Sequence, residues 1–411
     1  MMTGPKAIVH GRVIDGTGAE SIEDGVVVIR GGRTEAVGPA GEVEVPDDAE
    51  VIDASGRTVM PGLVEGHAHV GGTTAAQQVL RFSLQRGITT VCSVSANIAG
   101  IALRDGIEAR HVRGCARLVA GCVVSPTFGH VRFRTADGPW EVRKAVREMV
   151  EAGANFIKTA ASGGFWGEDE VCSVRNYTPE ELEALVDEAH AWHRPVVVHA
   201  HTQPGINNAI AAGVDQIHHG AFIDEGGLRA ILDADLWYMP TLRVTSDRNI
   251  GAWPERPWME AKMRPSQPVH REGARLAQSL GVKIAVGSDY PSSKHEWEIG
   301  DACMWELMEL VQAGLRPMDA IVASVKTTPE AYRLEDIGPL APGNRADLII
   351  VDGDPLADIG VLYDQANVKL TIKDGVVESA DADYAKHYAI REPHPAPEDR
   401  PQYDPLEGAE D

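Results

Sequence analysis

Two histidines separated by one residue close an apolar run near the start of the chain, where residues 60–69 read MPGLVEGHAH. Residues i and i+2 of a β-strand point to the same side, so both imidazoles of a strand ending here would face one point in space. Imidazole nitrogens are common ligands of divalent transition metals. The spacing of His67 and His69 therefore predicts part of a metal site, provided that other strand ends supply further ligands.

Three later apolar runs also end in residues that bind metals. Residues 196–201 read VVVHAH, residues 216–220 read QIHHG, and residues 284–289 read IAVGSD. In a (β/α)₈ barrel the carboxyl ends of all strands converge on one face, where active sites are built. Histidines and an aspartate far apart in the sequence would therefore meet at one mouth. Chance placement of such residues at four strand ends is improbable.

A lysine stands in a further apolar run, in which residues 155–160 read NFIKTA. Repulsion and desolvation would disfavour an ammonium inside a metal-lined barrel, so an ordinary Lys158 would point outwards or be an uncharged base. A carbamate formed on its amine would reverse the charge and offer two oxygens to bridge two metals. The residues themselves leave these alternatives open.

The elements that would position these residues alternate between strands and helices after Pro61. Amphipathic segments at 137–152 and 178–192 separate apolar runs, and this alternation predicts parallel strands with crossover helices. Eight strand candidates are present, which is the number that closes a barrel. They are residues 62–70, 89–93, 117–122, 156–160, 196–201, 216–220, 236–240 and 283–289.

The two ends of the chain differ from this pattern. Short β-type runs and turns occupy residues 7–52, and β-type sequence returns at 346–352 and 368–377. We therefore expect both ends to pair into one small β-sandwich domain with the barrel inserted between them. The expected limits are residues 1–60 and 343–380 for the small domain, 61–342 for the barrel, and 381–411 for an acidic, Pro-rich tail that is extended or poorly ordered.

Composition limits the classes of function. The 411 residues hold 38 Lys and Arg against 61 Asp and Glu, a net charge of −23 without any basic stripe, so no nucleic-acid partner is expected. The segment at 1–11 lacks a signal-peptide core, and no apolar run is long enough to cross a membrane. Five scattered cysteines without a CxxC pair argue against a disulfide framework and favour a soluble, cytoplasmic protein. They are Cys92, Cys115, Cys122, Cys172 and Cys303.

Together these motifs resemble the prolidase-like and imidazolonepropionase-like branch of the amidohydrolase superfamily, from about Ala7 to Val377. The resemblance implies an α/β fold, a (β/α)₈ TIM-like barrel with a small β-sandwich domain built from both chain ends. It also implies a hydrolase with two divalent metal ions, acting on a small molecule. The segments that carry it are MPGLVEGHAHV, FIKTAASGGF, VVVHAHTQPGINNAIAAGVDQIHHG, GSDYP and APGNRADLIIVDGDPL.

The resemblance also implies which residues bind the metals. His201 and His218 are neighbours of expected ligands, and the family pattern favours the first histidine of the fifth-strand pair and the histidine just before the sixth-strand glycine. Lys158 would be a carboxylated bridge between the two metals. The implied ligands are His67, His69 and Asp289 for the more buried metal, His199 and His219 for the second, and Lys158 for both.

Metal chemistry then predicts the reaction. Two divalent ions lower the pKa of a shared water to give hydroxide near neutral pH, and one of them polarises the substrate carbonyl. As in similar enzymes, Asp289 would take the proton from that hydroxide and return it to the leaving nitrogen. Hydrolysis of an amide-type C–N bond follows. His, carboxylate and carbamate ligands accept Zn, Mn, Co or Fe, and zinc is the metal that we expect.

Three further residues are candidates for substrate contact. His130 follows the third strand at a position that in similar enzymes reaches the substrate carbonyl or carboxylate, which makes it a catalytic candidate as well; the alternative is an ordinary loop histidine. Tyr177 precedes a helix and could instead pack against the start of that helix. Arg243 lies beyond the seventh strand, where it could pair with a substrate carboxylate or lie on the surface.

Aromatic residues bear on the choice of substrate. Residues 165–170 read FWGEDE, and Trp253 and Trp258 add bulk, which favours an aryl amide, carbamate or urea over a dipeptide, although dipeptides and N-acyl amino acids remain candidates. The alternatives are a cyclic-amide hydrolase of the imidazolone type, a mononuclear deaminase, and an inactive metal-binding relative. Lys158 favours the binuclear form over the deaminase, and the six ligand positions argue against an inactive relative. The resemblance also implies a homo-oligomer.

Overall fold

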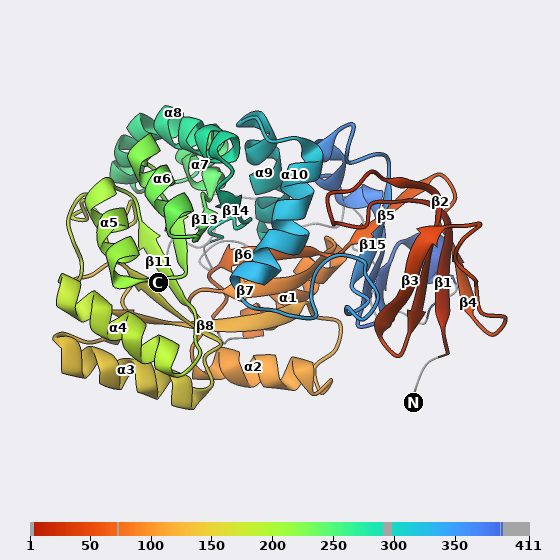
Figure 1. Ribbon diagram of the computed structural model, residues 1–411, viewed down its shortest axis with the longest axis horizontal. Helices are drawn as coiled ribbons and strands as arrows, with labels where there is room; N and C mark the ends of the chain where they lie inside the picture. Colours follow the sequence, from red (N-terminus) through yellow and green to blue (C-terminus); the bar gives the residue numbers. More distant parts are fainter. Residues whose placement is uncertain (1–3, 72–73, 291–297, 387, 389–411) are drawn as a thin grey trace.

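The computed structural model of the chain describes residues 4–71, 74–290, 298–386 and 388. Figure 1 shows a barrel beside a smaller mixed sheet. The barrel contains eight parallel strands that follow one another in sequence order, as predicted. They are β6 (Leu63–Ala68), β7 (Ile88–Ser93), β8 (Arg117–Ser125), β10 (Phe156–Ala160), β11 (Val196–Ala200), β12 (Gln216–His219), β13 (Trp237–Met239) and β14 (Lys283–Ile284), and the short β9 (Arg134–Thr135) pairs with β8.

The barrel closes between its first strand and the segment that continues β14. The Gly66 N–H donates to the carbonyl of Val286 at 3.0 Å, and the His69 N–H donates to the carbonyl of Tyr290 at 2.8 Å. A Cβ atom on Gly66 would lie 2.4 Å from the Val286 oxygen, so only glycine lets the two backbones come this close. This closure brings His67 in β6 and His69 just after it beside Asp289.

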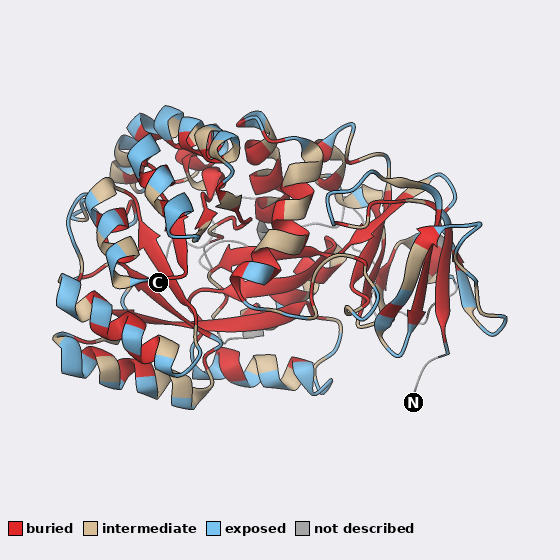
Figure 2. Ribbon diagram, viewed as in Figure 1, coloured by how far each residue is buried: buried red, intermediate tan, exposed pale blue. Residues whose placement is uncertain are grey.

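Helices cover the outside of the barrel and turn their exposed faces to solvent (Figure 2). The segments predicted to be amphipathic form α3 (Pro139–Ala152) and α4 (Pro179–Ala191), and α4 begins with a reciprocal capping box between Thr178 and Glu181. The other helices of the barrel unit are α1 (Thr74–Gln85), α2 (Ile98–Glu108), α5 (Gln203–Ala212), α6 (Glu225–Asp233), α7 (Asp247–Ile250), α8 (Pro257–Leu280), α9 (Glu298–Gln312), α10 (Pro317–Val322) and α11 (Thr328–Ala331).

No helix within the described ranges is long and apolar enough to span a bilayer. Short turns of helix complete the loops. Two of them, η1 (Leu242–Thr245) and the π-type η2 (Ala323–Thr327), lie in the barrel unit, and η3 (Ile359–Leu362) and η4 (Gln365–Asn367) lie between the last strands of the chain.

The second sheet is mixed and is built from both ends of the chain, as predicted. β15 pairs antiparallel with β5 over five residue pairs, from Leu348 opposite Pro61 to Asp352 opposite Arg57. Apolar side chains of both ends, such as Val27 and Ile350, belong to one buried cluster. The strands are β1 (Lys6–Val13), β2 (Ile22–Arg30), β3 (Arg33–Pro39), β4 (Glu50–Asp53), β5 (Arg57–Pro61), β15 (Leu348–Asp352), β16 (Val368–Lys373) and β17 (Val376–Ala380).

A buried cluster of charges joins the barrel to this sheet. Arg117, at the start of β8, is 4% exposed, and its Nη1 lies 2.7 Å from Asp347 Oδ2. Its Nη2 lies 2.7 Å from Asp374 Oδ1, and its Nε lies 3.1 Å from Glu108 Oε1. The other oxygen of Asp347 accepts the Asp374 N–H at 2.7 Å. One arginine therefore ties the loops of the sheet to the amino-terminal end of a barrel strand.

The first residues of the predicted tail are packed, unlike the expectation for that segment. They form the short helix α12 (Ala382–Ala385). The hydroxyl of Tyr384 donates to the Asp53 carbonyl at 2.7 Å and accepts from Arg57 Nη1 at 2.8 Å, because an apolar ring with one polar end suits the edge of the sheet. The rest of the predicted tail, residues 387 and 389–411, lies outside the described residues.

Candidate active site

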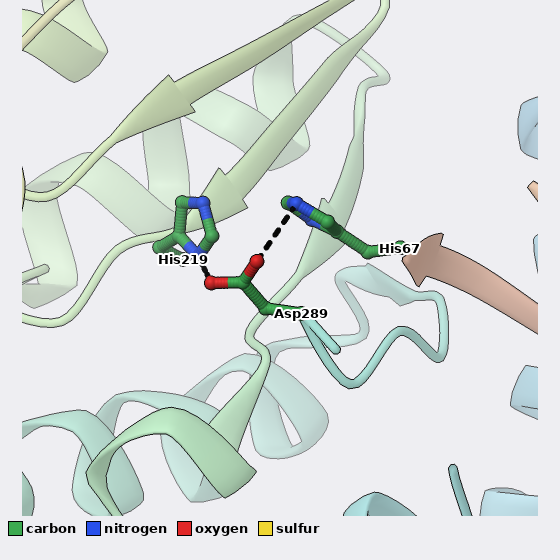
Figure 3. Close-up of side chains that lie close together, drawn as sticks. All are labelled: His67, His219 and Asp289. Atoms are coloured by element: carbon green, nitrogen blue, oxygen red, sulfur yellow. Dashed lines mark ion pairs between the residues drawn. The ribbon is translucent and has the colours of Figure 1, made fainter. Parts of the chain in front are cut away.

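Three residues at strand ends lie close enough to hold one metal ion (Figure 3). Each of His67, His219 and Asp289 offers one ligand atom, and these atoms lie within 4.8 Å of one another. Asp289 Oδ1 lies 3.3 Å from His67 Nε2, and its Oδ2 lies 4.0 Å from His219 Nδ1. His69 joins them, with Nε2 at 3.0 Å from Asp289 Oδ1. The residues come from β6, β12 and the segment after β14, so the barrel brings together the strand ends singled out in the sequence.

A cavity of about 510 Å³ opens at this face of the barrel. All six predicted ligands line it, and so do two of the three predicted substrate-contact residues, His130 and Arg243. The ligands are His67, His69, Lys158, His199, His219 and Asp289. His201 lines the cavity too, whereas His218 and Tyr177 do not.

The two adjacent histidines of β12 have different surroundings. His219 faces the cavity. His218 is fully buried behind it, where its Nδ1 lies 2.7 Å from His67 Nδ1 and its Nε2 lies 3.0 Å from Gln216 Oε1. Both rings lie beside that of His67, with centroids 4.8 Å away for His218 and 5.0 Å for His219, because the left-handed backbone of His219, with φ +75°, breaks the alternation of the strand. His218 therefore supports His67 from behind.

The two histidines at the end of β11 both line the cavity, since residues i and i+2 share a side. The ring of His199 stacks on His130 with centroids 3.9 Å apart, and its Nε2 lies 3.2 Å from the Gly163 carbonyl. His201 Nδ1 is buried and has no hydrogen-bond partner among the described residues. The choice of His199 over His201 as a ligand stays a prediction.

Lys158 points into the same space without a partner. The residue is 6% exposed, and its Nζ makes no hydrogen bond within the described part of the chain. Burial lowers the pKa of this amine to about 7, although the negative charge of Asp289 acts to raise it. At neutral pH an amine with this pKa is about half uncharged, and the uncharged form can act as a nucleophile.

The chemistry of these donors fits a divalent ion such as zinc. Burial, and then the positive charge of Lys158, lowers the pKa of His67 well below its usual value, and burial acts in the same direction on His199 and His219. Neutral imidazoles are the form that binds metal. The carboxylate of Asp289 and an unpartnered buried amine complete a set of nitrogen and oxygen donors.

Arg243 holds the backbone that carries Asp289. Its Nε donates to the Ser288 carbonyl at 2.7 Å, its Nη2 to the Asp289 carbonyl at 2.8 Å, and its Nη1 to Asn249 Oδ1 at 3.1 Å. Burial alone would raise the pKa of Asp289, but the hydrogen bond to His69 and the charges of His69, Arg243 and Lys158 lower it, so the carboxylate is ionised. We predicted that Arg243 could pair with a substrate carboxylate. In the structure its guanidinium is already hydrogen-bonded to the protein.

A carboxylate that the sequence did not single out fixes His130. Glu170 Oε2 lies 3.0 Å from His130 Nδ1 and accepts the Gly164 N–H at 3.1 Å. A Cβ atom on Gly164 would lie 2.5 Å from His130 Cε1, so the glycines after β10 make room for this ring. The acidic stretch 168–170 is the signal in the sequence, although it does not show which carboxylate turns inwards.

Tyr177 lies elsewhere. Its ring is 1% exposed in the main apolar core, and its hydroxyl donates to the Ala136 carbonyl at 3.2 Å. The structure therefore does not bring this predicted substrate-binding residue to the cavity. It packs just before α4, which is the alternative interpretation of its position in the sequence.

Sequence reasoning missed two hydroxyls that orient the histidines. Ser95 Oγ lies 3.1 Å from His69 Nδ1, and Thr241 Oγ1 lies 2.8 Å from His219 Nδ1. Such partners fix the orientation of a ligand ring. Each stands two residues after a barrel strand, β7 or β13, and this position is the signal that could have identified them. Arg132 and Phe133, in the loop of His130, line the outer part of the cavity and were also missed.

Aromatic side chains form another part of the cavity wall. The ring of Trp166 meets that of Trp253 edge to face at 5.3 Å, and the guanidinium of Arg256 lies 4.1 Å from the Trp166 ring centre. Trp258 Nε1 donates to the Trp166 carbonyl at 3.1 Å. Lys262 Nζ of α8 donates to the Glu170 carbonyl at 2.7 Å. These contacts hold the loop after β10 against α8.

The fold and the cluster of side chains that could hold a metal ion define a class. The chain belongs to the amidohydrolase family, whose family model matches residues 58–377, and the resemblance seen in the sequence is confirmed.

Individual relatives are more distant. Ochratoxinase from Aspergillus niger is 31% identical over 251 residues, which are 58% of this chain and 49% of that protein. Adenine deaminase 3 from Rhizobium johnstonii is 27% identical over 364 residues, 85% of this chain and 55% of that protein. The chain thus spans about half the length of these relatives. Imidazolonepropionase from Salinispora tropica is 23% identical over 359 residues, 80% of this chain and 86% of that protein.

Solved structures agree over nearly the whole chain. A Xaa-Pro dipeptidase with methionine bound in its active site has a TM-score of 0.81 and 29% identity, and the match covers 91% of this chain and 99% of that chain. Ochratoxinase from A. niger has a TM-score of 0.82 at 24% identity, covering 92% of this chain and 96% of that chain, and shows the shared fold. The predicted fold class is confirmed.

Proposed function

We propose that the chain is a metal-dependent hydrolase that cleaves an amide-type C–N bond in a small molecule. The observation that carries this proposal is the convergence, at one mouth of the barrel, of six imidazoles, two carboxylates and one buried amine without a partner among the described residues. The similarity to a dipeptidase over nearly the full chain supports hydrolysis of an amide-type bond.

We infer that the site holds two divalent ions, zinc being the expected metal. His67, His69 and Asp289 would bind one ion, and His199 and His219 the other. Lys158 would bridge them after its uncharged Nζ bonds to the carbon of CO₂ and releases one proton, which converts the amine into a carbamate anion. When bound, the ions supply Lewis acidity that activates water and polarises a carbonyl.

The side chains have separate tasks in this proposal. Asp289 carries a proton between the attacking water and the leaving nitrogen, because its carboxylate is ionised and lies at the mouth. His130, held by Glu170, contacts the substrate carbonyl from the stack on His199. Arg243 positions Asp289 through the carbonyls of residues 288 and 289.

Two other reactions of the same fold remain alternatives, each favoured by one relative. A deaminase is supported by the adenine deaminases, and a cyclic-amide hydrolase by imidazolonepropionase. Release of ammonia from an amino-purine would identify the first reaction. Ring opening of an imidazolone or a lactam, without activity on linear amides, would identify the second. An inactive metal-binding relative would show none of these activities.

Three further predictions from the sequence stand beside this function. We propose a homo-oligomer and keep residues 61–342 as the barrel unit and 1–60 with 343–380 as the small β unit. We also propose a reducing, cytoplasmic compartment, which is supported by the five cysteines, all of them free thiols and four of them buried.

The test combines metal content with activity. Protein purified without chelator is analysed for metal by mass spectrometry and assayed on N-acyl amino acids, dipeptides, aryl amides and phenylureas. We expect about two metals per chain, falling in Lys158→Ala together with activity, and a carbamate carbon signal in NMR after equilibration with ¹³C-bicarbonate. Lys144→Ala on the surface of α3 is the control and should retain both metals. One metal or none, with Lys158→Ala unchanged, would refute the two-metal site.

A further inference from the structure

One cation at the outer wall of the cavity has no task in the proposed reaction. Five charged residues line the cavity, and four of them are buried or engaged. Glu170 pairs with His130, Asp289 pairs with His69, and Lys158 is buried at depth. Arg243 is bound to backbone carbonyls. The fifth, Arg132, is exposed and makes no hydrogen bond or ion pair with the described residues.

The backbone that presents Arg132 is strained. Val131 has φ +53° and Phe128 has φ +62°, in the left-handed region that L-residues rarely adopt. For a β-branched residue such as valine this conformation is a genuine outlier, and strain of this kind persists at sites where it serves function. The loop is braced at its base, where the Thr127 N–H donates to Asp137 Oδ1 at 2.9 Å.

The residues near Arg132 contact two different parts of the cavity. His130, two residues earlier, stacks on the His199 ring next to the metal-binding side chains. Phe133, one residue later, is 55% exposed and also lines the cavity. Aromatic residues Phe165, Trp166 and Trp253 complete an apolar wall. A substrate with its scissile carbonyl at His130 would therefore present its outer end to a guanidinium within aromatic surroundings.

We propose that Arg132 binds a carboxylate of the substrate, so that the chain acts on N-acyl amino acids, dipeptides included, with an apolar side chain. This inference rests on the proposed amide hydrolysis and names its substrate class. A guanidinium offers two parallel N–H donors that match a carboxylate. Neutral aryl amides and ureas lack the anion and would leave Arg132 unused.

Binding of a matched pair of inert probes tests the proposal independently of catalysis. The first probe is 2-benzyl-4-oxopentanoate, which is N-acetylphenylalanine with its N–H replaced by CH₂, and the second is the neutral carboxamide of that acid. Titration calorimetry measures the affinity of each probe for the full-length protein with its bound metals. Because Arg132 is exposed, a charge-assisted hydrogen bond at the weak end of its range predicts about tenfold tighter binding of the acid.

Variants assign this preference to one residue. In Arg132→Gln the acid and its carboxamide should bind equally, whereas Arg132→Lys should keep part of the preference. Arg134→Gln is the matched control, because Arg134 begins β9 two residues later, lies outside the cavity lining and pairs with Glu148 at 2.7 Å. It should retain the full preference. Circular dichroism and thermal melting check that each variant is folded.

The outcomes separate this inference from the proposed function. Equal affinity of wild type for both probes, absence of acid binding at millimolar concentration, or a preference that survives in Arg132→Gln would overturn the role of Arg132. Hydrolysis of neutral and acidic amides at equal rates would overturn it as well and leave the proposed hydrolase activity intact. A preference for the acid without hydrolysis of any amide would uphold Arg132 and refute the hydrolase.

Discussion

Replacing Arg117 by leucine is expected to leave a buried carboxylate without its partner. Asp347 is 4% exposed, and Arg117 Nη1 at 2.7 Å is the cation paired with its Oδ2. Asp374 is better protected, because it keeps Arg345 at 2.9 Å after the change. The loss of stability should therefore come from Asp347, whose buried charge would no longer have a paired cation.

The expected loss follows from this geometry. Removing one partner of a buried ion pair costs about 3–5 kcal/mol. For a chain of 411 residues, with an unfolding entropy of about 2.1 cal/mol/K per residue, that loss lowers the melting temperature by about 3–6 °C. Surface pairs contribute about 0–1 kcal/mol, so Arg275→Leu, which breaks an exposed pair with Glu272, should shift melting by about 1 °C or less.

Differential scanning calorimetry at fixed zinc concentration provides the measurement. The double variant Arg117→Leu with Asp347→Leu removes the stranded charge and should recover most of the loss, since an apolar pair of similar volume is often neutral relative to a buried ion pair. Melting of Arg117→Leu at the temperature of the Arg275→Leu control, or a double variant less stable than the single one, would refute a cost from the unpaired Asp347 charge.

Two further changes are expected to act on stability. Tyr177→Phe loses the hydrogen bond to the Ala136 carbonyl and should cost about 1 kcal/mol by urea unfolding while KM stays unchanged; a raised KM would restore Tyr177 to the site. Burial would raise the pKa of Asp215, but hydrogen bonds from His190 and the Val196 N–H hold it below its usual value. A depressed pKa stabilises the fold above the unfolded value of about 4 and loses that effect as pH falls. Asp215→Asn should therefore be less stable than wild type at pH 7, and urea midpoints should converge below pH 4; a constant difference would contradict this.

Strand ends were predictable because periodicity and barrel geometry act together. His67 and His69 share a side of β6, and the barrel dictates where that side faces, so neither residue needs a structure to be placed. Periodicity does not place Asp289, which lies five residues beyond β14 in a left-handed conformation, so only the convergence of strand ends in a barrel predicted its position. Nor does periodicity choose between His199 and His201, because a spacing of two puts both at the cavity.

Loop residues were harder to place because no periodicity fixes their direction. Tyr177 precedes α4 and Arg243 follows β13. The ring of Tyr177 turns into the core, whereas Arg243 donates to backbone carbonyls. Arg132 was overlooked for the same reason. The direction of its side chain depends on left-handed backbone conformations at residues 128 and 131. The sequence does not indicate these conformations, because neither residue is a glycine.

The pairing of β5 with β15 has a consequence for synthesis on the ribosome. About 290 residues separate Pro61 from its partner Leu348, and at about 5–20 residues per second roughly 15–60 s pass before β15 emerges. During that time β5 has only two residue pairs, both with β1, to hold it in place. β6 follows β5 directly and carries His67. The nascent chain therefore completes the small sheet, which supports the start of the strand that carries His67, only after nearly all the barrel has been made.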